Sequence, residues 1–363
     1  MLIFSGMGIE ASDIDIVLKR KRKKTLISFG ILFLSLFLLF FFSIGVGSSH
    51  LGLIDSWKAL FGIGDSKTIN IVLKIRLPRT LGAMAVGAAL SLAGLLMQSV
   101  LKNPMASPST LGISNAASFG ANIGIMALSG MGLAGLGDFA IAAKSPWLVS
   151  LFALLFSFVC LLLVLFLSSF AKFKPSTVIL LGIAFSSFFQ ALTTLLQYFA
   201  DDVSLSAVTN WAFGNLERLS YLQIAIISGI AFFSLLVAIS LSYKLNALQG
   251  GETLARSMGV KTTSLRFVSL FLASLMTAVS VCFCGIIGFI GIMAPQSLKR
   301  IVGNNMKILI PFSFLGGAAL LLLCDIFTRL LGNGTSLPTG AVTAIIGVPF
   351  FIVLIFTKKE SLK

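Results

Sequence analysis

The sequence predicts an all-α polytopic membrane protein with about ten transmembrane helices in one bundle. Hydrophobic residues make up 57% of the 363 residues and charged residues only 11%, a balance that soluble globular domains do not show. The hydrophobic residues are gathered in runs of about 20, the length that a helix needs to cross a hydrocarbon core. Lipid offers the backbone no hydrogen-bond partner, so helices are the expected spans. Continuous runs such as Ile31–Ile44 exclude the alternating strands of a membrane barrel.

The chain begins with a basic segment, 1–24, that ends in a run of Lys and Arg residues, Lys19–Lys24. The apolar run 26–46 that follows is too long for a signal peptide, so we interpret it as a retained first span. Further spans are expected at 80–101, 111–129, 147–169, 176–199, 221–243, 264–284, 285–298 (a short one), 308–328 and 340–357. The transmembrane domain therefore covers 25–357, and a tail, 358–363, follows it.

The distribution of basic residues predicts the topology. If the N-terminus lies inside, 19 of the 27 Lys and Arg residues fall on the inner side and 8 on the outer side, which places both termini in the cytoplasm. Five of the outer eight lie in one stretch, Lys58–Arg79. Such an outer cluster favours an acidic partner docking there, or else arginines that reach the membrane interface from the start of a span.

Composition also limits the partners and the chemistry. The net charge is +15, but the basic residues are dispersed between apolar segments, which favours membrane-side loops and no nucleic-acid binding. The chain lacks the G-x-x-x-x-G-K-[ST] phosphate loop, so we expect it not to hydrolyse ATP by that mechanism and not to be an enzyme. A single histidine, His50, cannot form a histidine metal site and receives no role. No metal site is predicted, and the cysteines lie inside apolar runs as packing residues: Cys160, Cys282, Cys284 and Cys324.

Two inner loops stand out. Lys102–Pro108 is punctuated by prolines, and a rigid bend there would place Asn103 and Met105 at an inner constriction. The loop at about 244–263 contains Gly250-Gly251 and then a short amphipathic stretch that ends at Gly259, a typical helix-stop residue. A short cytoplasmic helix there is either a lever for another protein or an inert surface helix.

The span at 308–328 contains an acidic residue, Asp325, with Arg329 one helical turn later. An ionisable residue in a span is costly unless it is paired or in water, so we expect an Asp325–Arg329 ion pair near the outer end. This pair is either purely structural or, because Arg329 falls on the same outer face as Arg76 and Arg79, part of an outer charged surface.

Several motifs carry a family resemblance in collinear order from about residue 70 to 357. They are Arg76-Leu77-Pro78-Arg79, Gly87–Leu90 with Gly94 and Gln98, Asn103–Pro108, Leu111–Ser114, the 251–260 loop, Gly288–Gly291, Asp325 with Arg329, Leu337–Gly340 and Gly347–Phe351. Together they resemble the FecCD family of permeases, which are type II ABC importers for ferric siderophores, haem and vitamin B12. A departure is Pro295-Gln296, where many members carry Pro-His.

The resemblance implies the type II ABC importer permease fold with ten spans, in a multi-pass protein of the bacterial plasma membrane. It implies as partners a second permease subunit, identical or paralogous, two cytoplasmic ATPase subunits and an extracytoplasmic binding protein that delivers an iron chelate. Among the possible cargoes a ferric siderophore is the commonest in the family, with haem or cobalamin as alternatives. ATP and Mg²⁺ are expected on the ATPase subunits and no cofactor on this chain. Transport would proceed by alternating access.

Carried over by position, the resemblance also assigns roles to residues. Those that match the outer arginines pairing with the binding protein are Arg76, Arg79 and Arg329. Those that match the helix coupled to the ATPase are Gly251, Glu252, Ala255, Arg256 and Gly259. Those that fall at the cytoplasmic gate are Asn103, Met105, Pro175 and Ser176. The alternatives are an ion-coupled secondary transporter, an intramembrane enzyme and a channel; the first would need ion-coupling carboxylates near the midplane.

Overall fold

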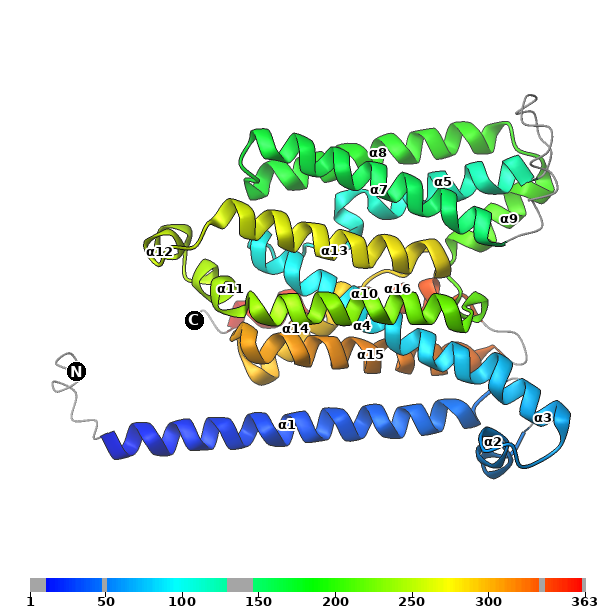
Figure 1. Ribbon diagram of the computed structural model, residues 1–363, viewed down its shortest axis with the longest axis horizontal. Coiled ribbons are helices and arrows are strands. Elements are labelled where there is room, and N and C mark those ends of the chain that lie inside the picture. The colour runs from blue at the N-terminus through cyan, green and yellow to red at the C-terminus, as the bar shows by residue number, and fades with distance from the viewer. Residues whose placement is uncertain (1–10, 48–50, 129–145, 333–336, 361–363) are drawn as a thin grey trace.

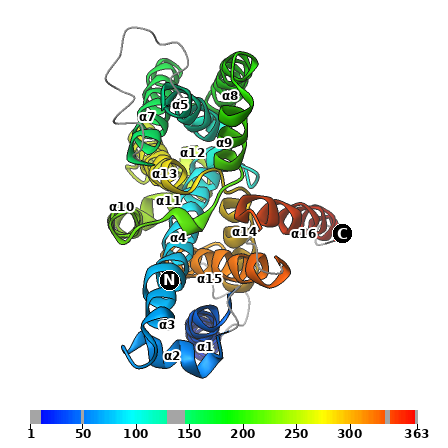
Figure 2. The same cartoon turned by 90° about the vertical axis from the view of Figure 1, so that its right-hand side faces the viewer.

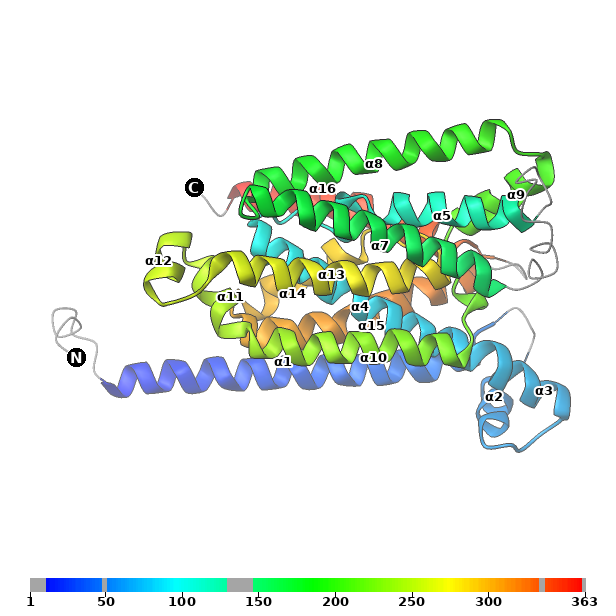
Figure 3. The same cartoon turned by 45° about the horizontal axis from the view of Figure 1, so that its top comes forward.

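The structure is a computed structural model that describes residues 11–47, 51–128, 146–332 and 337–360. All regular elements in these ranges are helices, and the long ones run roughly side by side along one direction (Figures 1 and 3). This is the arrangement that lipid imposes, because each helix satisfies its own backbone hydrogen bonds. The predicted fold class, a helical membrane bundle, is confirmed.

Ten helices occupy the ten predicted spans. They are α1 (Ala11–Gly45), α4 (Leu77–Leu101), α5 (Ile113–Leu128), α7 (Pro146–Phe170), α8 (Pro175–Tyr198), α10 (Tyr221–Ser240), α13 (Thr262–Cys284), α14 (Ile290–Val302), α15 (Met306–Leu331) and α16 (Thr339–Glu360). Within the described ranges, 7 helices are long and apolar enough to cross a membrane. The other three, α5, α14 and α16, have shorter described apolar stretches.

One expected boundary is wrong. The short span expected at 285–298 is helical only from Ile290, because Gly285 ends α13 with a left-handed φ of 77° and the chain stays irregular to Phe289, whose φ is 65°. The helix α14 then continues to Val302.

Short elements gather at the two ends of the bundle. At one end, which we call the outer end, lie α2 (Leu53–Leu60), α3 (Ser66–Ile71), a π-helical turn at Val72–Arg76, α9 (Asp202–Ala212) and a 3₁₀ turn at Leu216–Arg218 (Figure 1). At the opposite end, the inner end, lie α11 (Ser242–Gln249) and α12 (Glu252–Ser257), together with the start of α1 and the end of α16 (Figures 1 and 3).

Helix α4 is the centre of the bundle. It packs against α10, α13, α14 and α15, whereas α1 lies at an edge beside α15 (Figure 2). Glycines allow this close packing: a Cβ atom on Gly94 would lie 1.9 Å from the Gly291 carbonyl oxygen of α14, and one on Gly87 would lie 2.3 Å from that of Gly317 in α15. Ser91 strengthens the α4–α15 contact by donating to the Ser313 carbonyl at 2.6 Å. The small residues of this span therefore set the distances between helices.

Candidate functional site

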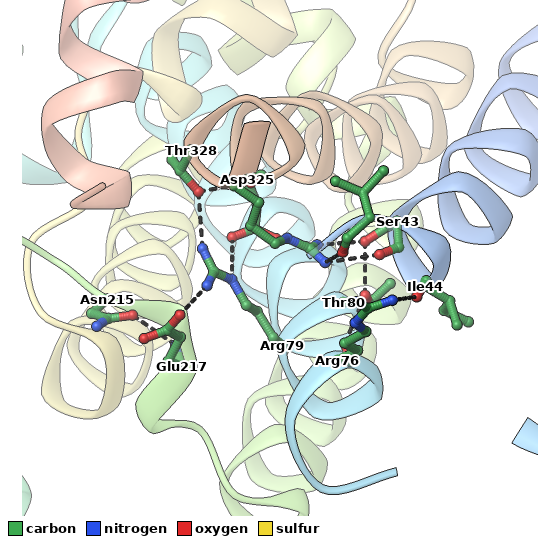
Figure 4. Close-up of polar contacts among 11 residues, drawn as sticks. Ser43, Ile44, Arg76, Arg79, Thr80, Asn215, Glu217, Asp325 and Thr328 are labelled. Carbon is green, nitrogen blue, oxygen red and sulfur yellow. Dashed lines mark hydrogen bonds and ion pairs between the residues drawn. The ribbon is translucent and has the colours of Figure 1, made fainter. Parts of the chain in front are cut away.

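At the outer end, a buried carboxylate lies between two guanidinium groups. Asp325 of α15 has no solvent exposure; its Oδ1 atom accepts from Arg79 Nε of α4 at 2.7 Å, and its Oδ2 atom accepts from Arg329 Nη2 at 2.5 Å (Figure 4). The expected pair one helical turn apart is therefore present, and it is extended by a second arginine from another helix. Sharing the carboxylate lowers the cost of burying the charges and joins α4 to α15.

The remaining nitrogens of Arg79 are also satisfied. Nη2 donates to Thr328 Oγ1 at 2.9 Å, and Nη1 pairs with Glu217 of the 3₁₀ turn that precedes α10 (Figure 4). Glu217 is itself positioned by Asn215, whose side-chain oxygen accepts from the Glu217 backbone N–H at 2.8 Å. A planar guanidinium with donors on three nitrogens suits this three-way junction.

Arg76 caps the C-terminal end of α1. Its Nη1 atom lies 3.0 Å from the carbonyl oxygens of both Ile44 and Gly45, and 2.9 Å from Ser56 Oγ of α2 (Figure 4). The last carbonyls of a helix have no donor within the helix and carry partial negative charge, so a buried cation satisfies both needs.

Arg329 caps the same end of α1 from the other side. Its Nη1 atom donates to the carbonyl oxygens of Ser43 at 2.8 Å and Val46 at 3.0 Å, and its Nη2 atom donates to Ser43 Oγ at 2.5 Å. Ser43 Oγ also shares a hydrogen bond of 2.8 Å with Thr80 Oγ1 of α4. Two arginines, one from α15 and one from the π-helical turn before α4, thus hold the otherwise peripheral first helix at its outer end.

The three arginines predicted at the outer end are largely buried in this conformation. Arg76, Arg79 and Arg329 are 3%, 4% and 9% exposed, so in this conformation they do not present free guanidinium groups to a docking protein. They bond instead inside the chain: Arg79 and Arg329 donate to Asp325, and Arg76 and Arg329 donate to the end of α1. A partner's carboxylate gains access to them only after internal bonds open.

At the inner end, α12 contains the residues matched to the coupling helix. Gly251 and Gly259 flank it with φ of 130° and 77°, values that favour glycine. Ala255 is the buried residue of the helix. Arg256 is exposed and its Nη2 atom lies 2.7 Å from Glu252 Oε1. The structure therefore brings all five together on one short helix and its ends.

Glu252 also reaches into the bundle. Its Oε2 atom accepts from Nη2 of Arg266, a buried residue of α13, at 3.0 Å. The Arg266 hydrogen bond is the largest cause that lowers the pKa of Glu252, with the charges of Arg266 and Arg256 and the Arg256 hydrogen bond acting in the same direction against burial. Arg266 received no role from the sequence, because one basic residue at the start of a span looks like any other topology signal.

The predicted gate residues lie on two elements of the inner end. Asn103 shapes the loop after α4, since its side-chain oxygen accepts from the Met105 backbone N–H at 2.9 Å, and Met105 is 49% exposed. Pro175 and Ser176 form the first turn of α8. The described residues include no hydrogen bond between these two pairs.

Gln296, the departure noted in the sequence, has a defined structural role. Its side-chain nitrogen donates to Gln98 Oε1 at 2.7 Å and to the Pro104 carbonyl at 3.3 Å, while Gln98 donates to the Gly291 carbonyl at 2.8 Å. The two glutamines thus join α4, α14 and the loop after α4. His50 lies outside the described residues.

Comparison with known proteins gives consistent matches along almost the whole chain. A model of the FecCD transport family matches residues 35–357. A protein of Methanocaldococcus jannaschii, named as an ABC transporter permease, is 38% identical over 343 residues, covering 94% of this chain and 98% of its own length. The Fe(3+) dicitrate transport system permease protein of Escherichia coli is 34% identical over 314 residues, covering 85% and 93%. The molybdate import system permease protein of Haemophilus influenzae is 32% identical over 328 residues, covering 88% and 92%.

A solved structure resembles the fold as well as the sequence. It is described as an inward-facing conformation of an ABC transporter of the metal-chelate type; it is 30% identical, covers 91% of this chain and 99% of its own, and superposes with a TM-score of 0.78. The similarity therefore covers most of the described bundle.

Proposed function

The chain belongs to the FecCD transport family of ABC transporter permeases, and we propose that it forms the membrane pathway of an importer for an iron chelate, with a ferric siderophore as cargo. The observation that carries this proposal is the similarity to a transporter of the metal-chelate type over 91% of the chain, with a TM-score of 0.78. Relatives named for Fe(3+)-citrate, hemin and iron(3+)-hydroxamate support the choice of an iron chelate.

The energy for transport comes, in this proposal, from two ATPase subunits that dock at the inner end around α12. Exposed apolar and charged residues are available there: Leu254 and Arg256 lie on α12, and Met258 follows it directly. ATP drives the switch between outward-open and inward-open pathways only if the ATPase pair binds it with different affinity in the two states. A second permease copy, identical or paralogous, completes the pathway.

The inner end faces the cytoplasm in this proposal, with both termini on that side. Basic residues gather there on several elements: Lys19, Arg20, Lys102, Lys172, Lys174, Lys244, Lys261, Lys299, Arg300 and Lys307. Such an excess is typical of cytoplasmic loops. The outer end, with Lys58, Lys67 and Lys74 exposed, is then left for a binding protein.

We further propose that docking of the binding protein engages the outer arginines by exchange. Acidic residues of the binding protein would compete with Asp325 and Glu217 for Arg79, which already has one partner at the surface, since Glu217 is 39% exposed. Complementary charge would then fix the register of docking.

Co-purification tests the ATPase partnership. Membranes are solubilised in mild detergent and the retained proteins identified by mass spectrometry, for the wild type and for the variant Leu254→Asp with Met258→Asp on α12. We expect an ABC ATPase with the wild type and its loss from the variant, because two charges placed on the exposed apolar part of α12 disrupt an interface there.

The matched control is Phe61→Asp, an exposed apolar residue at the outer end, which should retain the ATPase. A wild type that retains no ATPase while uptake survives ATP depletion and stops without an ion gradient would overturn the proposal in favour of a secondary transporter. The cargo is tested separately: cells that carry the importer should accumulate radioactive iron from a ferric hydroxamate, and accumulation of molybdate alone would contradict the iron assignment.

A further inference from the structure

The backbone at the inner end of α4 has an unusual hydrogen-bond requirement. The carbonyl of Val100 would normally accept from the N–H four residues later, but that residue is Pro104, which has no N–H. Helix α4 ends at Leu101, and Lys102 follows in a left-handed conformation with φ of 49°. A buried carbonyl at this place needs a donor from elsewhere in the molecule.

Arg266 supplies that donor. Its Nε atom lies 3.4 Å from the Val100 carbonyl oxygen, while its Nη2 atom donates to Glu252 of α12 at 3.0 Å. The Arg266 side chain is buried, with 4% exposure, so its bond to Val100 is shielded from water, whereas Glu252 on the other side is 38% exposed. One rigid guanidinium group therefore connects the short helix of the inner surface to the last turn of the central helix.

The segment Lys102–Ser107 follows α4 and belongs to the predicted inner loop 102–108, and two side chains from other helices attach it. Arg266 holds Val100 just before it, and Gln296 of α14 holds Pro104 within it at 3.3 Å. Met105, the residue that follows Pro104, is exposed. A shift of α12 therefore reaches the loop through one side chain, while α14 provides a second anchor.

We propose that Arg266 is a positioning residue that transmits movement of α12 to the loop 102–107, with Glu252 as the connection on the α12 side. This inference rests on the proposed function, because it requires ATPase subunits to move α12. The fork of the guanidinium group is essential to it: lysine carries the same charge but has a single terminal nitrogen and cannot keep both bonds in this geometry.

The test measures the loop directly and does not require knowledge of the cargo. Met105→Cys is introduced, and its labelling by a membrane-impermeant maleimide is followed in inverted membrane vesicles that contain the complete transporter, with and without ATP plus vanadate. The four native cysteines are buried, with exposures of 0–2%, and a chain without Met105→Cys measures their background. We expect nucleotide to change the labelling rate about fivefold or more, a usual size for coupling between two sites.

The same measurement is then made with Arg266→Met or Arg266→Lys added. The proposal predicts that the nucleotide-dependent change is lost in both, while the ATPase still co-purifies and still hydrolyses ATP. Glu252→Gln should reduce the change without abolishing it, because the amide keeps a hydrogen bond but loses the charge. Lys307→Met, an exposed basic residue at the same end, is the matched control and should behave as the wild type.

The outcomes distinguish failure of the proposed function from failure of the relay through Arg266. Absence of an ATPase from the parent transporter contradicts the proposed function. An ATPase that is present and active, together with an unchanged nucleotide response in Arg266→Lys, contradicts the relay alone. If Arg266→Met does not assemble, Arg266→Lys decides, since it retains the charge at the same position.

Discussion

Asp325 is shared by two buried guanidinium groups, so its removal leaves Arg329 without its carboxylate partner and Arg79 with Glu217 alone. We predict that Asp325→Asn lowers the free energy of unfolding by about 3–5 kcal/mol, the usual result of breaking a buried ion pair. Thermal unfolding of the purified protein in detergent measures this loss. Glu217→Gln is the comparison, because Glu217 is partly exposed and its loss should cost about 1 kcal/mol or less. Equal losses in the two variants would mean that burial of Asp325 does not increase the contribution of its ion pairs to the free energy of unfolding.

The Glu252 carboxylate gives a prediction about pH. Because the bond from Arg266 holds its pKa below the ordinary value of 4.5, the folded protein binds the proton less tightly than the unfolded chain. The stabilisation is therefore complete above about pH 4.5 and is lost as the pH falls through the lowered pKa. Hydrogen exchange of the α12 amides, corrected for intrinsic rates, should show constant protection between about pH 5.5 and 8 and a decrease only below that range.

Glu252→Gln provides the check on this assignment, since it removes the titrating group and should remove the acid-dependent decrease. Loss of protection in the wild type near pH 6.5 would point to a different titrating group and would contradict the link from Glu252 to Arg266.

At the scale of elements, the distance between α4 and α14 depends on one glycine. A Cβ atom at Gly94 would lie 1.9 Å from the Gly291 carbonyl oxygen, which no side-chain rotation relieves. Gly94→Ala should therefore separate the helices and lower stability by about 1–3 kcal/mol, the range for overpacking. Gly229→Ala in α10 is the matched control, because no atom lies within 4 Å of its added Cβ. The two melting temperatures in detergent decide, and a loss of similar size in both would rule out the contact as the cause.

The sequence predicted the spans well because lipid selects length and hydropathy, which are local properties. It predicted the start of α14 poorly, since the break from Gly285 to Phe289 is set by backbone angles inside an apolar run. The sequence predicts the partners of charged residues less well than it predicts the spans. Asp325 was paired with Arg329 from their spacing, but the bond from Arg79 joins residues 246 positions apart. No local pattern shows that α4 and α15 lie side by side at that level.

The same limit explains why the sequence does not show that the three outer arginines are buried. Hydropathy and charge counting place a residue along the membrane normal but do not say which carbonyls or carboxylates surround it. Hydropathy and charge counting give no sign of the role of Arg266 for this reason. Its partners are the Val100 carbonyl, which has no helical donor because residue 104 is proline, and a glutamate on a different element. A signal was present in Pro104, which removes the donor that Val100 would otherwise use.

At the scale of the whole molecule, the two ends of the bundle should lie on opposite sides of the membrane. Arg20→Cys near the start of α1 and Phe61→Cys after α2 are both exposed and at opposite ends. An impermeant maleimide should label Phe61→Cys in intact cells and Arg20→Cys only in inverted vesicles, because we propose that the basic inner end faces the cytoplasm. Labelling of both from the same side would contradict the assigned orientation, and the parent chain with its buried cysteines gives the background.

The capping of α1 by Arg329 also has a consequence for how the protein is made. Arg329 follows Ser43 by 286 residues, so at about 5–20 residues per second a ribosome needs roughly 15–60 seconds to reach it. Until then the outer end of the first helix has only its contacts to earlier residues, among them Arg76 and Thr80, and Arg79 lacks its bond to Asp325. A chain that ends before Arg329 therefore lacks the donors that this residue gives to the Ser43 and Val46 carbonyls, so α1 joins the bundle in its final way only when synthesis is almost complete.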